Sequence, residues 1–112
     1  MRESEVEAFV KRQVEGRDGV LLKFVSPSVA GVPDRIAIMP GGRVLFVEIK
    51  RQDGTLSKIQ AHVIDRLVDL GAEVSVIYGM PGATEWVRDL DSFVVMTGEW
   101  RGGDEAHAVY TP

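Results

Sequence analysis

The segment from residue 34 to residue 50 constrains the fold of this chain most strongly, because two strand-like runs flank a short turn. DRIAIM at 34–39 and RVLFVEIK at 43–50 are rich in large apolar and β-branched residues, as strands are. Pro-Gly-Gly at 40–42 separates them, and both residue types favour turns. The segment therefore predicts a β-hairpin.

Two loop lengths are possible for this hairpin, and they place Asp34 and Glu48 differently. A two-residue loop, 41–42, would send the two carboxylates to opposite faces of the sheet, because side chains alternate along a strand. It would also leave Pro40 at a paired strand position, where the missing N–H is a defect. A three-residue loop, 40–42, would put Asp34 directly across from Glu48.

Turn chemistry favours the three-residue loop. Pro40 suits the first position of a type I turn, and Gly42 can adopt the left-handed conformation that completes such a loop. Met39 then pairs with Arg43. We therefore expect the two carboxylates to converge.

Converging carboxylates need a chemical reason. Cross-strand Cβ atoms lie about 4.5–5.5 Å apart, and like charges at that distance are destabilising unless one is protonated or a cation lies between them. Asp34 and Glu48 together offer hard oxygen ligands that suit Mg²⁺ or Mn²⁺. Lys50, roughly 7 Å along the strand from Glu48, would place an ammonium beside the metal, as phosphodiester chemistry requires. The alternative is a solvated strand edge with a turn aspartate.

The remaining pattern predicts one α/β domain, because helix-like and strand-like segments alternate along the chain. The expected elements are a helix at 3–15, a strand at 20–25, a loop at 26–33, a helix at 56–70, a strand at 73–78, a short helix at 83–90 and a possible strand at 92–96. The order αβββαβ indicates a central sheet flanked by helices. We expect the domain to span 1–91, with 92–112 as a C-terminal extension that could add a strand or hairpin.

Composition excludes several classes of site. The 112 residues include no cysteine, so disulfides and thiolate metal sites are excluded, and no apolar run approaches the ~18 residues of a membrane span. The polar start MRESEVEAF does not resemble a signal peptide, and a cytoplasmic location is expected. Residues 1–66 carry 11 Lys and Arg against 9 Asp and Glu, whereas 67–112 carry 2 against 8. The basic share coincides with the hairpin and permits a nucleic-acid partner.

Pro33-Asp34 followed by Glu48-Ile49-Lys50 is the PD-(D/E)XK nuclease signature. Over roughly residues 3–80 the chain resembles the VRR-NUC domain, especially its short stand-alone bacteriophage versions. The matching motifs are Glu3-x-x-Val-Glu7, Lys23-Phe24-x-Ser26-Pro27, Gly31-Val32-Pro33-Asp34-Arg35, Val47-Glu48-Ile49-Lys50 and Leu56-Ser57-x-x-Gln60. The resemblance implies the mixed central sheet of restriction-endonuclease-like domains.

The resemblance also implies site residues. Asp34, Glu48 and the backbone carbonyl of Ile49 would bind the divalent metal. Lys50 would orient or activate the attacking water and steady the scissile phosphate. Glu7 would reach the metal directly or through water, although an acidic residue early in a helix is equally favourable to the helix dipole.

Several other positions have two readings. Gln60 completes the capping box Ser57-x-x-Gln60, and it could instead contact the active-site lysine or the substrate. Four basic residues are candidate DNA phosphate contacts, although single basic residues are more commonly solvated surface. They are Lys23, Arg35, Arg51 and Lys58.

The family resemblance implies a Mg²⁺- or Mn²⁺-dependent DNA endonuclease. For small phage versions it further implies a homodimer acting on branched DNA such as four-way junctions, with no membrane and no small-molecule cofactor involved, in the cytoplasm of a bacterial host. One alternative is a monomeric nicking or flap nuclease that assists a larger replication or packaging protein. Another is a nucleic-acid-binding module without catalysis.

Overall fold

The computed structural model of the 112-residue chain describes residues 2–96 and contains three helices and four strands within them. In chain order they are α1 (Glu3–Glu15), β1 (Val20–Lys23), β2 (Arg35–Met39), β3 (Arg43–Lys50), α2 (Lys58–Asp69), β4 (Glu73–Tyr78) and α3 (Gly79–Met96). In these residues no helix is long and apolar enough to cross a membrane.

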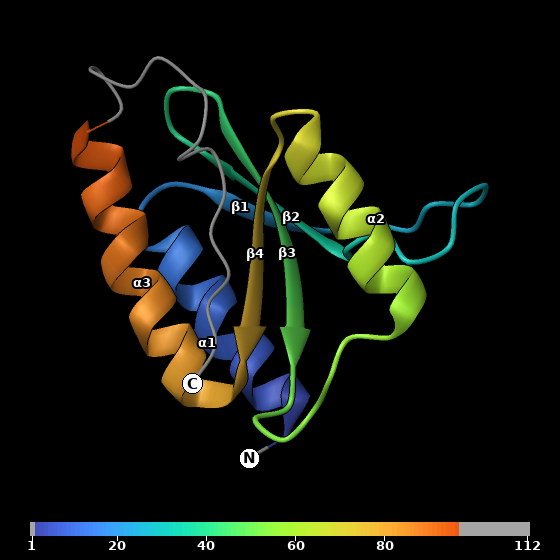
Figure 1. Ribbon diagram of the computed structural model, residues 1–112. Helices are drawn as coiled ribbons and strands as arrows, with labels where there is room; N and C mark the ends of the chain where they lie inside the picture. The colour runs from blue at the N-terminus through green and yellow to red at the C-terminus, as the bar shows by residue number, and fades with distance from the viewer. Residues whose placement is uncertain (1, 97–112) are drawn as a thin grey trace.

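The four strands form one mixed sheet in the order β1-β2-β3-β4. The first three strands are antiparallel, and β4 lies parallel to β3 because α2 provides the crossover between them. Helices α1 and α3 cover one face of the sheet, and α2 packs on the other face (Figure 1). The predicted α/β architecture, with a mixed sheet between helices, is confirmed.

The central hairpin has the predicted three-residue loop. Met39 pairs with Arg43 and Ile36 with Phe46, so the register is the one that brings Asp34 across from Glu48. The turn type differs from the prediction. The Gly42 N–H donates to the Met39 carbonyl over 3.1 Å, and φ is +88° at Gly41, whereas a type I turn needs a negative φ there. A type II turn fits this geometry, because its third residue requires a positive φ that glycine adopts readily.

The hydrophobic core lies mainly between the sheet and the α1–α3 pair. Val6, Val10 and Val14 have no exposed surface and form the apolar stripe of α1, at the spacing of a helix that packs along one side. They pack with buried residues of β1–β4 and with Ala83, Trp86 and Leu90 of α3. The buried Trp86 indole donates to the Ser75 hydroxyl over 2.9 Å, which satisfies its one polar group. A smaller cluster centred on Ile64 fixes α2 to the opposite face.

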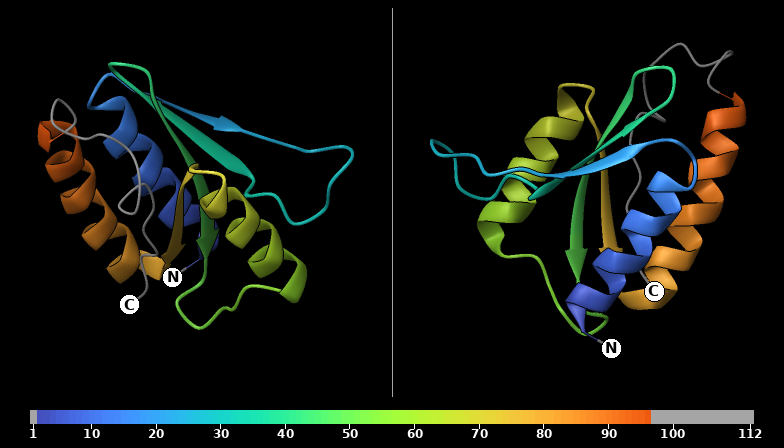
Figure 2. Two further views of the ribbon diagram at one scale, coloured as in Figure 1. Left: turned by 45° about the horizontal axis from the view of Figure 1, so that its top comes forward. Right: turned by 180° about the vertical axis from the view of Figure 1, so that it is seen from behind.

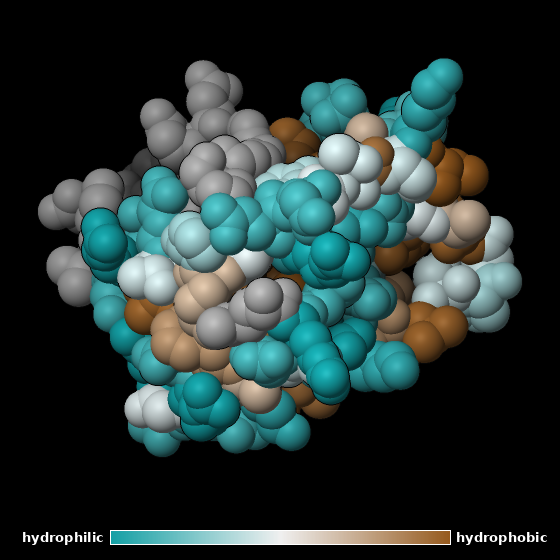
Figure 3. Space-filling model, turned by 90° about the horizontal axis from the view of Figure 1, so that it is seen from below, coloured by the Kyte–Doolittle hydropathy of each residue, from teal (hydrophilic) through white to brown (hydrophobic). Residues whose placement is uncertain are grey.

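The loop between β1 and β2 projects from the body of the domain on the side of α2 (Figure 2). It returns to the sheet past Gly31, where φ is +88° and an added Cβ would lie 2.8 Å from the Ile59 carbonyl oxygen of α2. Glycine is therefore needed at this close approach. Figure 3 looks onto the end of the molecule where β3 and β4 terminate; hydrophilic residues cover much of it, and hydrophobic patches lie towards both the α2 side and the α3 side.

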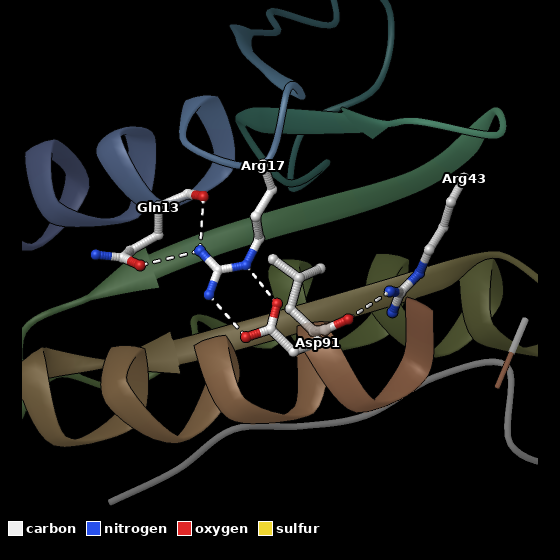
Figure 4. A network of polar contacts seen from close by, with 5 residues as sticks. Gln13, Arg17, Arg43 and Asp91 are labelled. Atoms are coloured by element: carbon white, nitrogen blue, oxygen red, sulfur yellow. Dashed lines mark hydrogen bonds and ion pairs between the residues drawn. The ribbon is translucent and has the colours of Figure 1, made fainter. Parts of the chain in front are cut away.

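The strand expected at 92–96 is wrong, because α3 continues as a helix from Gly79 to Met96. Its buried residues keep helical spacing up to Leu90, and two arginines hold this part of the helix (Figure 4). Arg17 pairs with both carboxylate oxygens of Asp91, and Arg43 donates to the Leu90 carbonyl over 3.2 Å. A short apolar run can be strand or helix by sequence, and here it continues the helix that begins at Gly79. The rest of the predicted extension, 97–112, lies outside the described residues.

Four other boundaries differ by one or two residues from the expected ones: β1 ends at Lys23, β2 begins at Arg35, and α2 begins at Lys58, with Ser57 as its N-cap, and ends at Asp69. Helix α3 begins at Gly79, four residues before the expected start at 83. The β1–β2 ladder nevertheless continues past its last assigned pair, because the Phe24 N–H donates to the Asp34 carbonyl over 2.9 Å. This bond holds Asp34 at the start of β2.

Candidate active site

Four of the five predicted catalytic residues lie where β2 begins and β3 ends, beside the first turns of α1: Glu7, Asp34, Glu48 and Lys50. A hollow of about 170 Å³ opens there, lined by Glu3, Ser4, Glu7, Asp34, Arg35 and Ile49. It lies at the hydrophilic end of the molecule seen in Figure 3, where β3 terminates. The hollow thus joins one helix and two strands that are distant in the sequence.

Glu48 is the unusual residue of the site. Its neighbours on β3 are apolar, and it is only 5% exposed, which is costly for a carboxylate. The register places it one pair beyond Arg35–Val47, opposite Asp34. Burial raises the pKa of the Glu48 carboxyl, and the negative charge of Asp34 raises it further, while Lys50 and a hydrogen bond from the Asp34 backbone act in the opposite direction. The convergence predicted from the loop length is therefore confirmed.

Lys50 lies on the same face of β3 as Glu48, two residues further along. Its Nζ atom is 3.8 Å from Glu48 Oε2, a long ion pair, and its side chain is one-fifth exposed. Asp34, by contrast, has a side chain that is 56% exposed. The site therefore combines one buried acid, one accessible acid and one partly accessible lysine.

Glu7 reaches the hollow from α1, where Arg35 binds it. Arg35 Nε donates to Glu7 Oε2 over 3.2 Å, and Arg35 Nη2 donates to Glu7 Oε1 over 2.8 Å. These hydrogen bonds lower the pKa of the Glu7 carboxyl, and the charges of Lys11 and Lys23 act in the same direction. The predicted position of Glu7 beside the site is confirmed, and in this structure both of its oxygens are engaged by Arg35.

Arg35, one of the predicted phosphate contacts, is largely buried and paired within the protein, and its contact with DNA stays a prediction. Its side chain is 16% exposed, and besides Glu7 it donates to the Asp34 carbonyl over 2.9 Å. Its Nη1 atom also lies 3.5 Å from Asp34 Oδ2. Strand alternation offered a signal for this role, because Arg35 must face the opposite side of the sheet from Asp34, towards α1.

The site chemistry fits a divalent metal held by two acids. Asp34 and Glu48 supply hard oxygen donors, and a cation near them would relieve the repulsion that raises the pKa of Glu48. Ile49 lines the same hollow. Within residues 2–96, no group of three or more acidic or histidine side chains is arranged to hold a metal ion. The predicted metal contacts of the Ile49 carbonyl and of Glu7 stay predictions, and in this structure both carboxylate oxygens of Glu7 are bound by Arg35.

Gln60 has a structural role in the described fold. Its side-chain Oε1 atom accepts a hydrogen bond from the backbone N–H of Ser57 over 2.9 Å, and its backbone N–H donates to Ser57 Oγ over 3.1 Å. These two bonds complete the capping box of α2. Its side-chain oxygen is thus used by the helix cap. A catalytic role for Gln60 stays a prediction.

Three of the predicted phosphate contacts are accessible to solvent. Lys23 and Lys58 are exposed, and the side chain of Arg51 is 63% exposed and lies 3.2 Å from the Asp53 carboxylate. Arg51 directly follows β3. Their contact with DNA stays a prediction.

Comparison with known proteins agrees with this geometry. The model of the VRR-NUC domain family matches residues 3–81. A relative named "Putative nuclease p44", from Acyrthosiphon pisum secondary endosymbiont phage 1, is 36% identical over 77 residues, which cover 69% of this chain and 83% of the relative. A solved structure described as a VRR_NUC domain superposes with a TM-score of 0.65 at 23% identity, covering 83% of this chain and 94% of that one, and supports the fold.

The fold and the site define a nuclease domain of the PD-(D/E)XK class, with nucleic acid as its substrate. Within that class, the chain belongs to the VRR-NUC family, as its motifs predicted.

Proposed function

We propose that this protein is a divalent-metal-dependent DNA endonuclease that hydrolyses phosphodiester bonds, acting as a homodimer on branched DNA such as four-way junctions. The observation that carries the catalytic part is the buried Glu48 facing Asp34, with Lys50 on the same face of β3. Such a pair of carboxylates costs stability unless one is protonated or a cation lies close by, and clustered ionisable groups of this kind commonly mark functional sites.

Asp34 and Glu48 would hold Mg²⁺ or Mn²⁺, with the Ile49 carbonyl as a further ligand. When bound, the metal supplies Lewis-acid stabilisation of negative charge on the phosphate. Lys50 orients the attacking water and places its ammonium against the scissile phosphate, where charge develops as the P–O bond breaks. Glu48 keeps the Lys50 ammonium close to the site, since the two side chains lie 3.8 Å apart.

Dimerisation is supported by an apolar surface that α2 leaves open. Val20, Ile38 and Val44 are paired in one row across β1, β2 and β3, and they are 40%, 37% and 44% exposed. The next row begins with Leu22, which is 45% exposed. Exposed apolar patches of this kind commonly mark protein–protein interfaces. Because these rows lead along the sheet to Asp34, a two-fold dimer over this face would present two active sites to one branched substrate.

One rival is a monomeric nicking or flap nuclease working beside a larger replication or packaging protein. It shares the catalytic residues and differs in oligomeric state and substrate. The other rival is a nucleic-acid-binding module without catalysis. Retention of Asp34, Glu48 and Lys50 in one cluster counts against that module. In a phage context the protein would act on DNA in the cytoplasm of the bacterial host.

The test is cleavage of linear, flapped and four-way DNA with Mg²⁺, with Mn²⁺ and with a chelator. We expect metal-dependent cleavage of four-way DNA that Asp34→Asn and Lys50→Ala abolish. Asp69→Asn, an exposed acid at the end of α2, is the matched control and should cleave normally. Cleavage in the chelator, or cleavage that survives both active-site changes, would refute the metal mechanism.

Sedimentation of the free protein tests the dimer separately. We expect the wild type to sediment as a dimer and Ile38→Arg to sediment as a monomer. A wild-type monomer that cuts only flaps would favour the first rival.

A further inference from the structure

We propose that Arg35 is a positioning residue that holds Glu7 beside the metal position and keeps its carboxylate out of direct coordination. This inference rests on the metal-dependent function proposed above. It assigns different roles to the acids of the site. Asp34 and Glu48 bind the metal directly, whereas Glu7 contacts it only through water.

The first observation is the geometry of the Arg35–Glu7 pair. Two N–H groups of the guanidinium donate to the two oxygens of one carboxylate, at 3.2 Å and 2.8 Å. This forked pairing fixes the orientation of the carboxylate as well as its distance. The two side chains are 16% and 34% exposed, so water screens the pair less than it screens a surface ion pair.

The second observation is the link from Arg35 to the metal-binding side. The third N–H donor of Arg35 reaches the Asp34 carbonyl over 2.9 Å. Arg35 therefore joins α1 to the first residue of the catalytic hairpin. Any shift of Glu7 towards the metal position must break the forked pair or move the strand that carries Asp34.

The third observation is the side from which each acid approaches. Arg35 pairs with Lys23 on β1 and with Val47 on β3, and Val47 is buried in the core beneath α1. Arg35 and Glu7 therefore lie on the α1 side of the sheet, whereas strand alternation sends Asp34 and Glu48 to the other side. Arg35, Glu7 and Asp34 line one hollow, at the edge where the two sides of the sheet meet, and Glu48 is not among its lining residues.

These contacts have a consequence for metal binding. Mg²⁺ keeps several water ligands in protein sites, and a third carboxylate bound directly would take a position needed by water or phosphate. A released Glu7 would bind the cation more tightly and leave fewer positions for the reaction. Loss of Arg35 should therefore strengthen metal binding and weaken cleavage at the same time.

The experiment measures Mn²⁺ binding by titration calorimetry without DNA, and cleavage of four-way DNA by the same proteins. The variants are Arg35→Lys, Arg35→Gln, Glu7→Gln and the double variant Arg35→Gln/Glu7→Gln. Lysine keeps the charge but cannot make the forked pair. We expect Arg35→Lys and Arg35→Gln to bind Mn²⁺ more tightly, by roughly 3- to 30-fold as a carboxylate approaches the cation, and to cleave more slowly.

The double variant separates two causes of tighter binding. If the gain came only from removing a positive charge, Arg35→Gln would tighten binding equally with and without the Glu7→Gln change, and Arg35→Lys would bind like the wild type; that result overturns the proposal. We expect the gain to be much smaller when the Glu7 carboxylate is absent. A purely structural role is excluded by the opposite signs, because local unfolding weakens both binding and cleavage.

Failure of the two proposals can be told apart. If the wild type does not bind Mn²⁺, the metal-dependent function fails, and this inference with it. If the wild type binds Mn²⁺ but the Arg35 variants bind it equally or more weakly, with circular dichroism showing an intact fold, only the positioning role is wrong.

Discussion

Replacing Glu48 by glutamine should stabilise the metal-free protein while removing its activity. Glu48 is 5% exposed, and burial is the main cause that raises its pKa, so the ionised carboxylate is a cost to the fold. Glutamine keeps the shape and removes the charge. Functional sites commonly carry such a cost, and relieving it typically adds about 0.5–2 kcal/mol.

The sign of the effect depends on two opposing charges. Attraction to Lys50 across 3.8 Å is a gross term of about 4 kcal/mol at an effective dielectric constant of 20. Repulsion from Asp34 at a cross-strand distance of about 5 Å is a gross term of about 3 kcal/mol, reduced further by solvent around the exposed Asp34. The attraction exceeds the repulsion by roughly 1–2 kcal/mol, and the cost of burying an ionised carboxylate, several kcal/mol in proteins, exceeds that difference. We therefore expect a net gain of about 1 kcal/mol, which raises the melting temperature by about 4 °C in a domain of this size.

The assay is thermal unfolding in a chelator at neutral pH, repeated with added Mn²⁺. Glu48→Gln should melt higher than the wild type in the chelator, and Mn²⁺ should stabilise the wild type but not the variant. Asp34→Asn is the matched control: its side chain is 56% exposed, so its metal-free gain should be smaller. If Glu48→Gln lowers the melting temperature in the chelator, the Lys50 pair outweighs burial and the reasoning is wrong.

Three further predictions concern the rest of the domain. Trp86→Ala should lower the free energy of unfolding by about 3–5 kcal/mol in chemical denaturation, because the side chain is 1% exposed at the centre of the α3 contact. Ser57→Ala and Gln60→Ala should each lower the free energy of unfolding by about 1 kcal/mol, because each removes half of the same helix cap. The two variants should cleave DNA at equal rates, and much slower cleavage by Gln60→Ala would reveal contact with the substrate. Arg17 lowers the pKa of the Asp91 carboxyl from its ordinary value of 3.8. The pair should therefore stabilise the fold fully at pH values above 3.8, and this stabilisation should be lost as the pH falls through the lowered pKa. Asp91→Asn should therefore cost up to about 1 kcal/mol at pH 7 and progressively less as pH falls below 3.8, and a cost that does not change with pH would contradict the pairing.

Local chemistry made much of the site predictable. The turn residues 40–42 set the loop length, the loop length sets the register, and the register brings Asp34 to Glu48. Each step depends only on residues that are close together in the sequence. Because side chains alternate along a strand, the register set at the turn also determines which residues face each other several positions away. The predicted turn type is wrong because Pro at the second residue suits types I and II alike, and it is the Gly at the third that favours type II.

Longer-range features were not available from the same reasoning. Residues 92–96 form an apolar run that suits a strand by itself, and in the structure they continue the helix α3. Likewise, the capping box of Ser57 and Gln60 was visible as a motif, whereas its actual bonds required the folded helix.

The sequence by itself determined the family, the hairpin and the pair of acids, because these depend on short-range geometry and residue type. Only the tertiary structure decided that Arg35 faces α1 and binds both oxygens of Glu7. The two residues are 28 positions apart, and no local rule brings them together. Their contact arises because α1 buries Val6 and Val10 against the sheet and thereby places Glu7 at its edge, where the strand delivers Arg35. The physical reason is that hydrophobic packing sets the relative position of α1 and β2, and the ion pair forms where that packing puts it.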